Sequence, residues 1–365
     1  MDMFSIPADF NIGSIKTINK LNSEHKNAKI YEVYGQITIG HPIGSGRAND
    51  LLPSVDRLIL KEYIDTLEKN NIEFNYTLNS ICLGNMEFTE SGYRDIKEFI
   101  LDLYSIGVRK FTIALPSLID VIRLLKLDIK IKASTCCQIT NVNQAIAYEK
   151  MGVKHIVIDE RINRDFATIN EITTYYQGDT EVIVNVICHK NCIYEVFHHN
   201  QTSHDIACSQ VQPSTLYYSH KCALQQTTKP SDFLKLNWVR PEDLHLYESV
   251  GIRYYKIQGR QSVLKGNIYK TVQAYMERSY DGDFVQLVNC FHKLNSFQYE
   301  IDNRFLDSYV KPYFENKNFC HSNCRACNYC DEYIKKLIGF SRMEQLYKQA
   351  QSFYTSYNTL RQLDK

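Results

Sequence analysis

Three stretches of the chain repeat one pattern of polar and apolar positions. In IGVRKFTIAL at 106–115, MGVKHIVID at 151–159 and VGIRYYKIQGR at 250–260, a helix-like segment reaches a glycine, and β-branched and aromatic residues follow. Glycine adopts the left-handed conformation that ends many helices, and the apolar run is typical of a buried strand. The pattern predicts the helix-to-strand junctions of a parallel sheet.

Helical and strand-like segments alternate along the chain. Helical periodicity predicts helices at 57–70, 91–106, 117–126, 140–151 and 241–250. Strands are expected near 30–37, 72–78, 109–115, 129–135, 154–159, 181–187 and 252–257. Steady alternation predicts an α/β fold with a (β/α)8 TIM-barrel-like core, its eighth strand hidden in 205–220. The lack of a G-x-G-x-x-G turn favours this barrel over an open doubly wound sheet.

The alternation of strands and helices predicts the domain boundaries. Residues 1–28 are expected to form an N-terminal extension, and 29–280 the barrel, with a cysteine-rich insertion at 188–222. The alternation stops at about residue 281. The segment 281–365 contains a cysteine cluster at 320–330 and an expected terminal helix near 342–358. We interpret it as an appended C-terminal element.

Composition narrows the class of protein. The chain has 365 residues with 42 Lys and Arg against 41 Asp and Glu, so its net charge of +1 gives no overall attraction to nucleic acid or anionic lipid. No apolar stretch approaches the length of a membrane span, and no leader-like segment opens the chain, which predicts a cytoplasmic protein without membrane contact. Twelve cysteines in such a protein indicate metal or redox chemistry rather than disulfides.

The C-terminal segment contains a compact cysteine motif. The sequence FCHSNCRACNYC places Cys320, Cys324, Cys327 and Cys330 in C-x3-C-x2-C-x2-C spacing. Thiolates this close repel one another unless a cation or cluster neutralises them. The staggered spacing favours a [4Fe-4S] cluster, since it reverses the order of the bacterial ferredoxin run, and leaves zinc as the alternative.

A second cysteine group follows the expected strand EVIVNVI at 181–187. It comprises Cys188, Cys192, Cys208 and Cys222, and histidines are interleaved among them. The spacing is too irregular for a zinc finger, but Cys188 is expected at the carboxyl end of a barrel strand, where active sites are built. From spacing alone, a metal site and a chance grouping of buried cysteines both remain open.

Several pieces of the sequence together resemble the U32 family, historically named as peptidases. They are KASTCCQITNVNQAIAYEKMGVKHIVIDERINRDF at 132–166, the cysteine-rich stretch after EVIVNVICHKNC, and KPSDFLKLNWVRPEDLHLYESVGIRYYKIQGR at 229–260. Family members show the same order of features and a closing strand that reads Phe-Lys-Ile-x-Gly-Arg. The resemblance covers roughly residues 30–280.

The resemblance implies a barrel-like core and a [4Fe-4S] cluster on four cysteines, which map by position onto Cys188, Cys192, Cys208 and Cys222. The C-terminal cysteines would hold a second cluster or zinc. The family resemblance further implies oxygen-independent hydroxylation of an RNA base or a small aromatic molecule, or action on a peptide. Such an enzyme would work with an electron donor or with a partner protein of the same family. Two departures mark a divergent subgroup: the short spacing of the first cysteine pair, and Gln258 where an acidic residue is common.

Charged residues at expected strand ends are the candidates for catalysis. They are Asp159, Glu160, Arg161, Lys256 and Arg260. Carboxylates suit proton transfer and guanidinium groups suit anion binding, while a helix-start ion pair at 159–161 is an equal alternative. Asn79, at another strand end, and His41 and Arg47, in the loop GHPIGSGRAND, are further candidates for the same mouth.

Two other functions stay open. A peptidase would use Cys136 or Cys137, at the end of the strand IKIKAST, as the nucleophile, although no H-E-x-x-H or G-x-S-x-G motif accompanies them. Adjacent cysteines at a strand end are more often packing residues. A zinc-bearing adaptor without catalysis is the third hypothesis, and the lack of a redox couple for zinc would distinguish it from the first.

Overall fold

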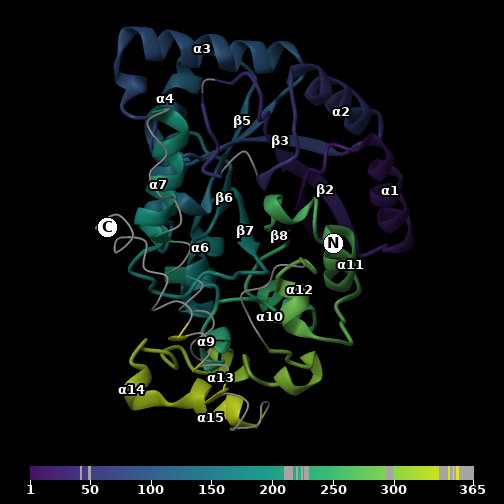
Figure 1. Ribbon diagram of the computed structural model, residues 1–365, viewed down its shortest axis with the longest axis vertical. Coiled ribbons are helices and arrows are strands. Elements are labelled where there is room, and N and C mark those ends of the chain that lie inside the picture. Colours follow the sequence, from purple (N-terminus) through teal and green to yellow (C-terminus); the bar gives the residue numbers. More distant parts are fainter. Residues whose placement is uncertain are drawn as a thin grey trace.

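Eight parallel strands close into a barrel with helices around it (Figure 1). The computed structural model describes residues 1–41, 43–47, 51–208, 217–218, 221–222, 225, 230–292, 299–336, 344–345, 348 and 351–352, with side chains of the helix at 195–208 described as far as residue 203. The strands are β1 (Asp2–Pro7), β2 (Ala28–Gly35), β3 (Glu73–Leu78), β4 (Lys110–Ile113), β5 (Lys130–Ala133), β6 (His155–Val157), β7 (Asp179–Ile183) and β8 (Tyr254–Lys256). The expected (β/α)8 core is confirmed.

One strand of the barrel comes from a different part of the chain than the sequence predicts. Residues 2–7 form β1, which pairs with β2 on one side and β8 on the other, Phe4 lying opposite Tyr255. Strands β7 and β8 pair directly, with Val182 opposite Tyr255. The described strands close the barrel with residues 2–7 in the place expected for a strand within 205–220, a segment that lies mostly outside the described residues. Residues 2–7 are therefore part of the barrel rather than of an extension.

Helices follow most strands and cover the outside of the barrel. They are α1 (Ile15–Glu24), α2 (Arg57–Lys69), α3 (Glu90–Ser105), α4 (Pro116–Leu124), α5 (Val142–Lys150), α6 (Phe166–Tyr175), α7 (Glu195–Cys208), α9 (Ser231–Leu234), α10 (Leu244–Ser249) and α11 (Ile268–Glu277). Gly107, Gly152 and Gly251 all have positive φ where helices end, as the repeated junction predicts. The helix expected at 342–358 falls largely outside the described residues.

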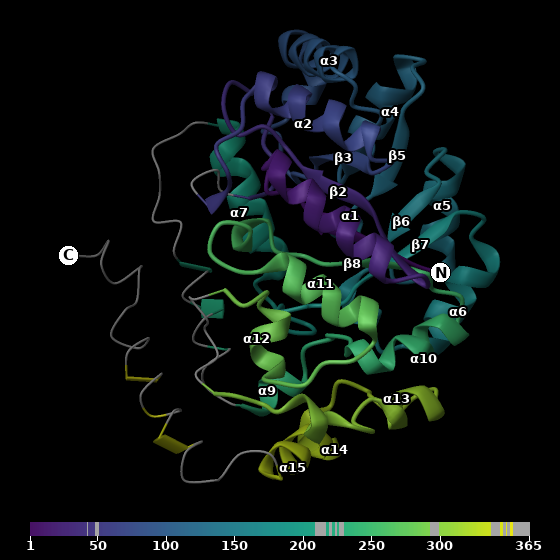
Figure 2. The ribbon, with the colours of Figure 1, turned by 90° about the vertical axis from the view of Figure 1, so that its right-hand side faces the viewer.

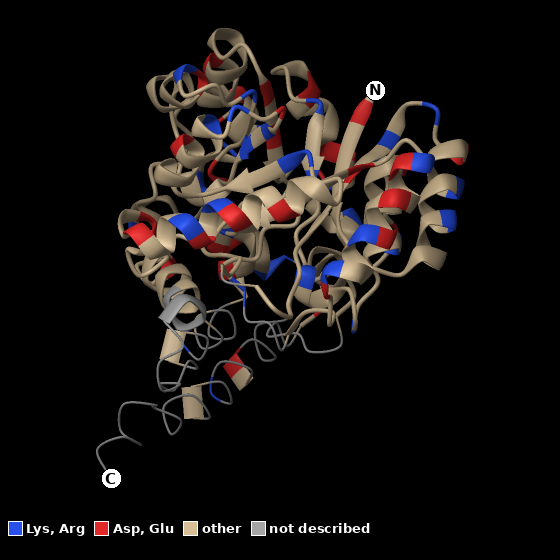
Figure 3. Cartoon of the chain, turned by 90° about the horizontal axis from the view of Figure 1, so that it is seen from above, with Lys and Arg blue, Asp and Glu red and all other residues tan. Residues whose placement is uncertain are grey.

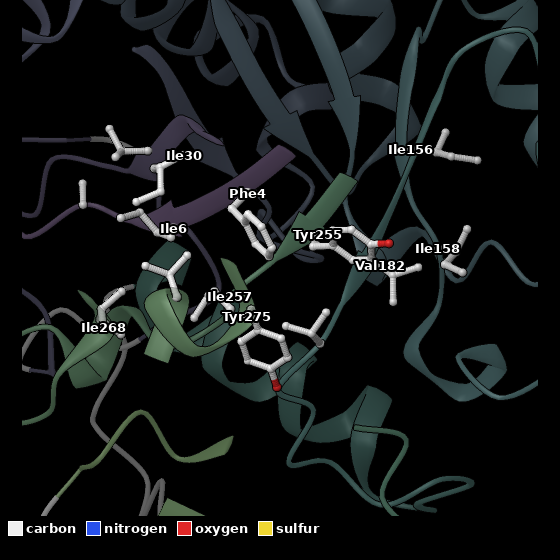
Figure 4. Packing of buried hydrophobic residues seen from close by; sticks show 14 of the residues in the cluster. Phe4, Ile6, Ile30, Ile156, Ile158, Val182, Tyr255, Ile257, Ile268 and Tyr275 are labelled. Carbon is white, nitrogen blue, oxygen red and sulfur yellow. The ribbon is translucent and has the colours of Figure 1, made fainter. Parts of the chain in front are cut away.

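The apolar core lies between the strands and the helices. On β1, Phe4 and Ile6 are buried against this layer, and the Phe4 ring lies 5.5 Å from the ring of Tyr255. Figure 4 shows these side chains with Ile257 and Tyr275 around the same packing region. Successive strand residues face opposite sides, so Ser5, between Phe4 and Ile6, faces the barrel interior.

The barrel interior contains a buried polar layer. The Lys132 amine on β5 donates to Glu32 Oε1 on β2 at 2.7 Å and to Glu181 Oε2 on β7 at 2.9 Å. Ser5 Oγ donates to Glu181 Oε1 at 2.7 Å, and the Lys110 amine lies 2.6 Å from Glu32 Oε2. These contacts cross the barrel and tie together strands that are not neighbours in the sheet. None of these side chains was singled out from the sequence.

The C-terminal segment packs against one end of the molecule. It contains α12 (Phe284–Val288), α13 (Lys311–Glu315), α14 (Cys324–Cys327) and α15 (Tyr329–Lys335). Figure 2 shows α13 to α15 together, beside α9 and α10. Lys and Arg are mixed with Asp and Glu over the outer helices (Figure 3), which agrees with the balanced net charge.

Candidate functional site at the barrel mouth

A cavity opens at the carboxyl ends of the strands, the end at which barrel enzymes place their active sites. Its polar walls come from loops after β2, β3, β5, β6, β7 and β8, and helix α7 supplies residues over it. The lining includes Tyr34, Arg47, Thr77, Asn79, Ser134, Cys136, Glu160, Cys188, Glu195, His199, Lys256, Gln258 and Arg260. Three of the five predicted catalytic residues, Glu160, Lys256 and Arg260, therefore line one cavity.

Lys256 ends β8 and is 8% exposed. Its amine lies 3.4 Å from the centroid of the Tyr34 ring, and no hydrogen-bond acceptor is present for Nζ among the described residues. Burial lowers the pKa of Lys256 to about 7, and the negative charge of Glu181 opposes part of that shift. The amine is thus partly neutral near pH 7.

The run Asp159-Glu160-Arg161 divides into an ion pair and a separate buried carboxyl. Arg161 Nε donates to Asp159 Oδ1 at 2.8 Å, and Asp159 also accepts from the Arg161 backbone amide. This is the helix-start pair that the sequence left as an alternative. Glu160 instead lines the cavity, where burial raises the pKa of its carboxyl to about 8, helped by the charges of Glu195 and Asp159.

Arg260 uses its guanidinium to hold the mouth of the barrel together. It donates to Gln36 Oε1 at 2.7 Å, Ser45 Oγ at 2.9 Å and Thr77 Oγ1 at 3.0 Å. A further bond reaches Asn79 Oδ1 at 3.3 Å. Because these acceptors belong to β3 and to the loops after β2 and β3, Arg260 positions the cavity wall, whereas the sequence favoured a role in binding an anion.

Arg47 is the second guanidinium group at the mouth. It lines the cavity from the loop after β2, as the sequence suggested for that loop. Its positive charge lowers the pKa of His199 and of Arg260, in each case adding to the larger effect of burial. His41, predicted for the same loop, bonds to the carbonyl of Ile43 at 2.8 Å.

The first cysteine group is only partly described. Cys188 lines the cavity, and burial raises the pKa of its thiol well above the usual value, with further effects of Glu160 and Cys222. Burial also raises the pKa of Cys222 to about 11, and Cys192 contributes to that shift. The Cys208 side chain lies outside the described residues.

The C-terminal cysteines surround one hollow. Cys320, Cys324, Cys327 and Cys330 all line it. Tyr309 OH lies 3.1 Å from Cys330 Sγ, and the Lys190 amine lies 3.8 Å from Cys320 Sγ. Tyr309 donates its proton to the carbonyl of Leu234, so the Lys190 ammonium is the donor that would suit an anionic sulfur cluster here.

The loops of the two cysteine groups are in contact. Lys190, which follows Cys188 by two positions, approaches Cys320, and Asn191 Nδ2 donates to Ser322 Oγ at 2.9 Å. In the described part of the chain, no three Cys, His, Asp or Glu side chains stand close enough to hold a single metal ion. The thiols thus suit a sulfur-rich site in their chemistry, but the described residues do not form a coordination shell.

Cys136 and Cys137 lie on the short turn after β5. Cys136 lines the cavity, and the Cys137 thiol points to the carbonyl oxygens of Ile113 and Ala114, each at 3.4 Å. Burial raises the pKa of Cys136 and raises that of Cys137 to about 12. Because the thiolate is the nucleophile, this environment does not favour a cysteine peptidase.

The chain is thus a closed parallel (β/α)8 barrel with charged groups and thiols at the carboxyl end of its strands, and comparison with known proteins shows its family. The chain belongs to peptidase family U32, whose profile matches residues 39–323. It is 30% identical over 342 residues to an uncharacterized protease of Methanocaldococcus jannaschii, covering 92% of this chain and 99% of the relative. The resemblance found from the sequence is confirmed.

Similar solved structures include a U32 peptidase with 15% identity and a TM-score of 0.49, covering 71% of this chain and 94% of that one. Another is a glycerol uptake operon antiterminator-related protein of Thermotoga maritima, with 12% identity and a TM-score of 0.29, covering 55% and 92%. Among the described residues, no helix combines the length and apolar character that spanning a membrane requires.

Proposed function

We propose that this chain is a U32-family iron-sulfur enzyme that modifies its substrate at the barrel mouth without molecular oxygen. The substrate would be an RNA base, a peptide or a small aromatic molecule. The observation that carries the proposal is that Cys188 lines the same cavity as Glu160 and Lys256. A sulfur ligand, a carboxyl and an amine thereby share one small, largely buried volume.

Cys188, Cys192, Cys208 and Cys222 would hold a [4Fe-4S] cluster, which when bound supplies one-electron chemistry. The chain's own groups have separate tasks. Glu160, buried in the wall, would hold a proton for transfer to or from the substrate. Arg260 and its hydrogen-bonded loops would keep the cavity in shape, and α7 would limit the entry of water.

The C-terminal cysteines would hold a second [4Fe-4S] cluster or, as the alternative, zinc. The contact between residues 190–191 and 320–322 supports a second cluster that passes electrons to the barrel mouth or braces this loop. An electron donor, or a partner protein of the same family, would then meet the enzyme. We place the reaction in the cytoplasm, because a reducing compartment suits a chain whose twelve cysteines indicate metal or redox chemistry.

The test is metal analysis of protein purified without oxygen. Iron, acid-labile sulfide and zinc are measured per chain in the wild type and in the Cys188→Ala and Cys327→Ala variants. Cys82→Ala, a partly exposed cysteine outside both groups, is the matched control. About eight irons per chain, falling to about four in each variant and unchanged in the control, are expected for two [4Fe-4S] sites.

Other metal contents would change the proposal. About four irons, lost in only one of the two variants, would assign a single cluster to that group. Zinc without iron would overturn the redox chemistry and favour the adaptor hypothesis. If hydrolysis of a peptide were detected and then lost with Cys136→Ser, the peptidase hypothesis would replace the proposal.

A further inference from the structure

Lys256 differs from the other buried lysines of the barrel. The Lys132 amine makes bonds to Glu32, Glu181 and Tyr31, and the Lys110 amine contacts Glu32 and Glu73. Lys256 is buried to a similar degree, but its amine has only the face of the Tyr34 ring beside it among the described groups. Leaving a buried amine without an acceptor is costly for a fold, so the arrangement calls for a functional reason.

The Lys256 amine also faces a cavity that a ligand can enter. Lys256 lines the barrel-mouth cavity rather than the closed interior layer. The Tyr34 hydroxyl is directed away, since it donates to the carbonyl of Ile257 at 2.7 Å, so the ring presents a π face and no acceptor to the amine. An unpartnered amine that faces a cavity is available to a ligand that enters the cavity.

Charges around Lys256 come from several elements. Glu181 on β7 and Glu32 on β2 favour the ammonium form, whereas Lys132 on β5 and Arg260 after β8 disfavour it. Burial is the largest effect and lowers the pKa to about 7. A neutral amine is the form that attacks carbonyl carbon, and desolvated lysines are the usual nucleophiles of this kind.

We propose that Lys256 forms a covalent imine with a small carbonyl compound that carries a carboxylate. The nitrogen lone pair forms a bond to the carbonyl carbon while the C=O π bond breaks, and a proton passes from nitrogen to that oxygen to give a carbinolamine. A second proton, taken from solvent, lets the hydroxyl leave as water and gives the iminium ion, which becomes the imine when its N–H proton returns to solvent. Addition of water reverses these steps. Atoms and electrons balance without an oxidant or reductant.

Arg47 argues for the carboxylate. Its guanidinium lines the same cavity, and in the described residues no acidic side chain forms an ion pair with it. Guanidinium groups bind carboxylates in a paired geometry. A small 2-oxo acid would therefore bring its carboxylate to Arg47 and its carbonyl carbon to Lys256. This activity goes beyond the proposed iron-sulfur function and does not depend on it.

The experiment uses glyoxylate with cyanoborohydride, which reduces an imine to a stable carboxymethyl-lysine that peptide mass mapping locates. We expect Lys256 to be labelled at pH 7 at least about tenfold faster than Lys130, an exposed lysine of β5. Between pH 7 and 9 the rate at Lys256 should rise about twofold, while that of an ordinary lysine rises about a hundredfold. Arg47→Met should raise the half-saturating glyoxylate concentration.

Several results would overturn the inference. They are labelling of Lys256 no faster than that of Lys130, a steep rise at Lys256 up to pH 9, or binding of glyoxylate without a trapped adduct. Mapping of the wild-type chain needs no variant, so a misfolded Lys256→Met protein would not affect the result. Iron content is measured on the same sample. If Lys256 is labelled in protein that contains no iron, the iron-sulfur function is contradicted but the imine at Lys256 is not.

Discussion

At the scale of single residues, the barrel shows two ways of burying a lysine. Lys132 is fully buried and lies between two carboxylates, so its charge is compensated. Lys256 is nearly as buried but has no such partner among the described residues, and its amine loses part of its charge instead. The first arrangement serves the fold, and the second weakens it in favour of reactivity.

Replacing Lys256 with Met should therefore stabilise the protein. The pKa of Lys256 is lower in the fold than its ordinary value of 10.5, so the wild type loses stability as the pH falls from 10.5 toward 7. We expect Lys256→Met to raise the free energy of unfolding at pH 7 by about 1–3 kcal/mol. The gain should shrink as the pH approaches 10.5. Urea denaturation followed by circular dichroism measures both, and a destabilised variant at pH 7 would contradict the argument.

At the scale of elements, β5 offers a matched pair of lysines on the same face of one strand, one at its exposed amino end and one buried in the barrel. Lys132 faces the interior, and Lys130 is exposed, 3.4 Å from Glu73. Lys132→Met should destabilise the fold by about 3–5 kcal/mol, because Glu32 and Glu181 would be left buried without its compensating charge. Lys130→Met should cost no more than about 1 kcal/mol. Equal midpoints of thermal unfolding in the two variants would count against this account of the interior layer.

The elements that the sequence predicted correctly share a local signal. Helix ends at Gly107, Gly152 and Gly251 are fixed by backbone conformation, and the strands after them are apolar runs. Strand β1 lacked such a signal, because DMFSIP at 2–7 is short and no helix-to-glycine junction precedes it. Its pairing with the next strand, β2, and with β8, far away in the sequence, makes it a strand.

The candidate site was predictable in part for the same reason. Glu160, Lys256 and Cys188 follow recognisable strands, so their place at one mouth could be read from the order of elements. The bonds of Arg260 to Gln36 and Thr77 depend on three-dimensional closure and could not. The sequence did not predict the buried layer of Lys132, Glu32 and Glu181, because a single Glu or Lys in a strand can equally face solvent.

At the scale of the whole molecule, one buried arginine fastens the C-terminal segment to the barrel. Arg164 donates to the carbonyl oxygens of Leu234 and Trp238 at 2.7 and 3.2 Å. Its guanidinium carbon lies 4.3 Å from the centroid of the Trp238 ring and 5.2 Å from that of Tyr309. Tyr309 also donates to Leu234, so barrel loop and C-terminal segment meet at this cation.

We expect Arg164→Met to loosen residues 299–336 while the barrel stays folded. Loss of two buried hydrogen bonds and the stacked cation should cost about 2–4 kcal/mol. Hydrogen exchange resolved by peptide should show faster exchange in 299–336 and little change in β2 to β5. Arg304→Met, an exposed arginine of the same segment, is the control. Unchanged exchange in 299–336 would show that other contacts suffice.

The pairing of β1 with β8 also determines when the barrel can close during synthesis. Met3 lies opposite Tyr254, so β1 must wait for a barrel segment that is synthesised much later before both of its edges are bonded. Until then the growing chain has strand edges with unpaired amides and carbonyls, a state open to association with other chains. Closure across such a sequence distance is slow to find, because most of the chain must be ordered first. Closure of the barrel is therefore a late event in translation, because it requires residues 254–256.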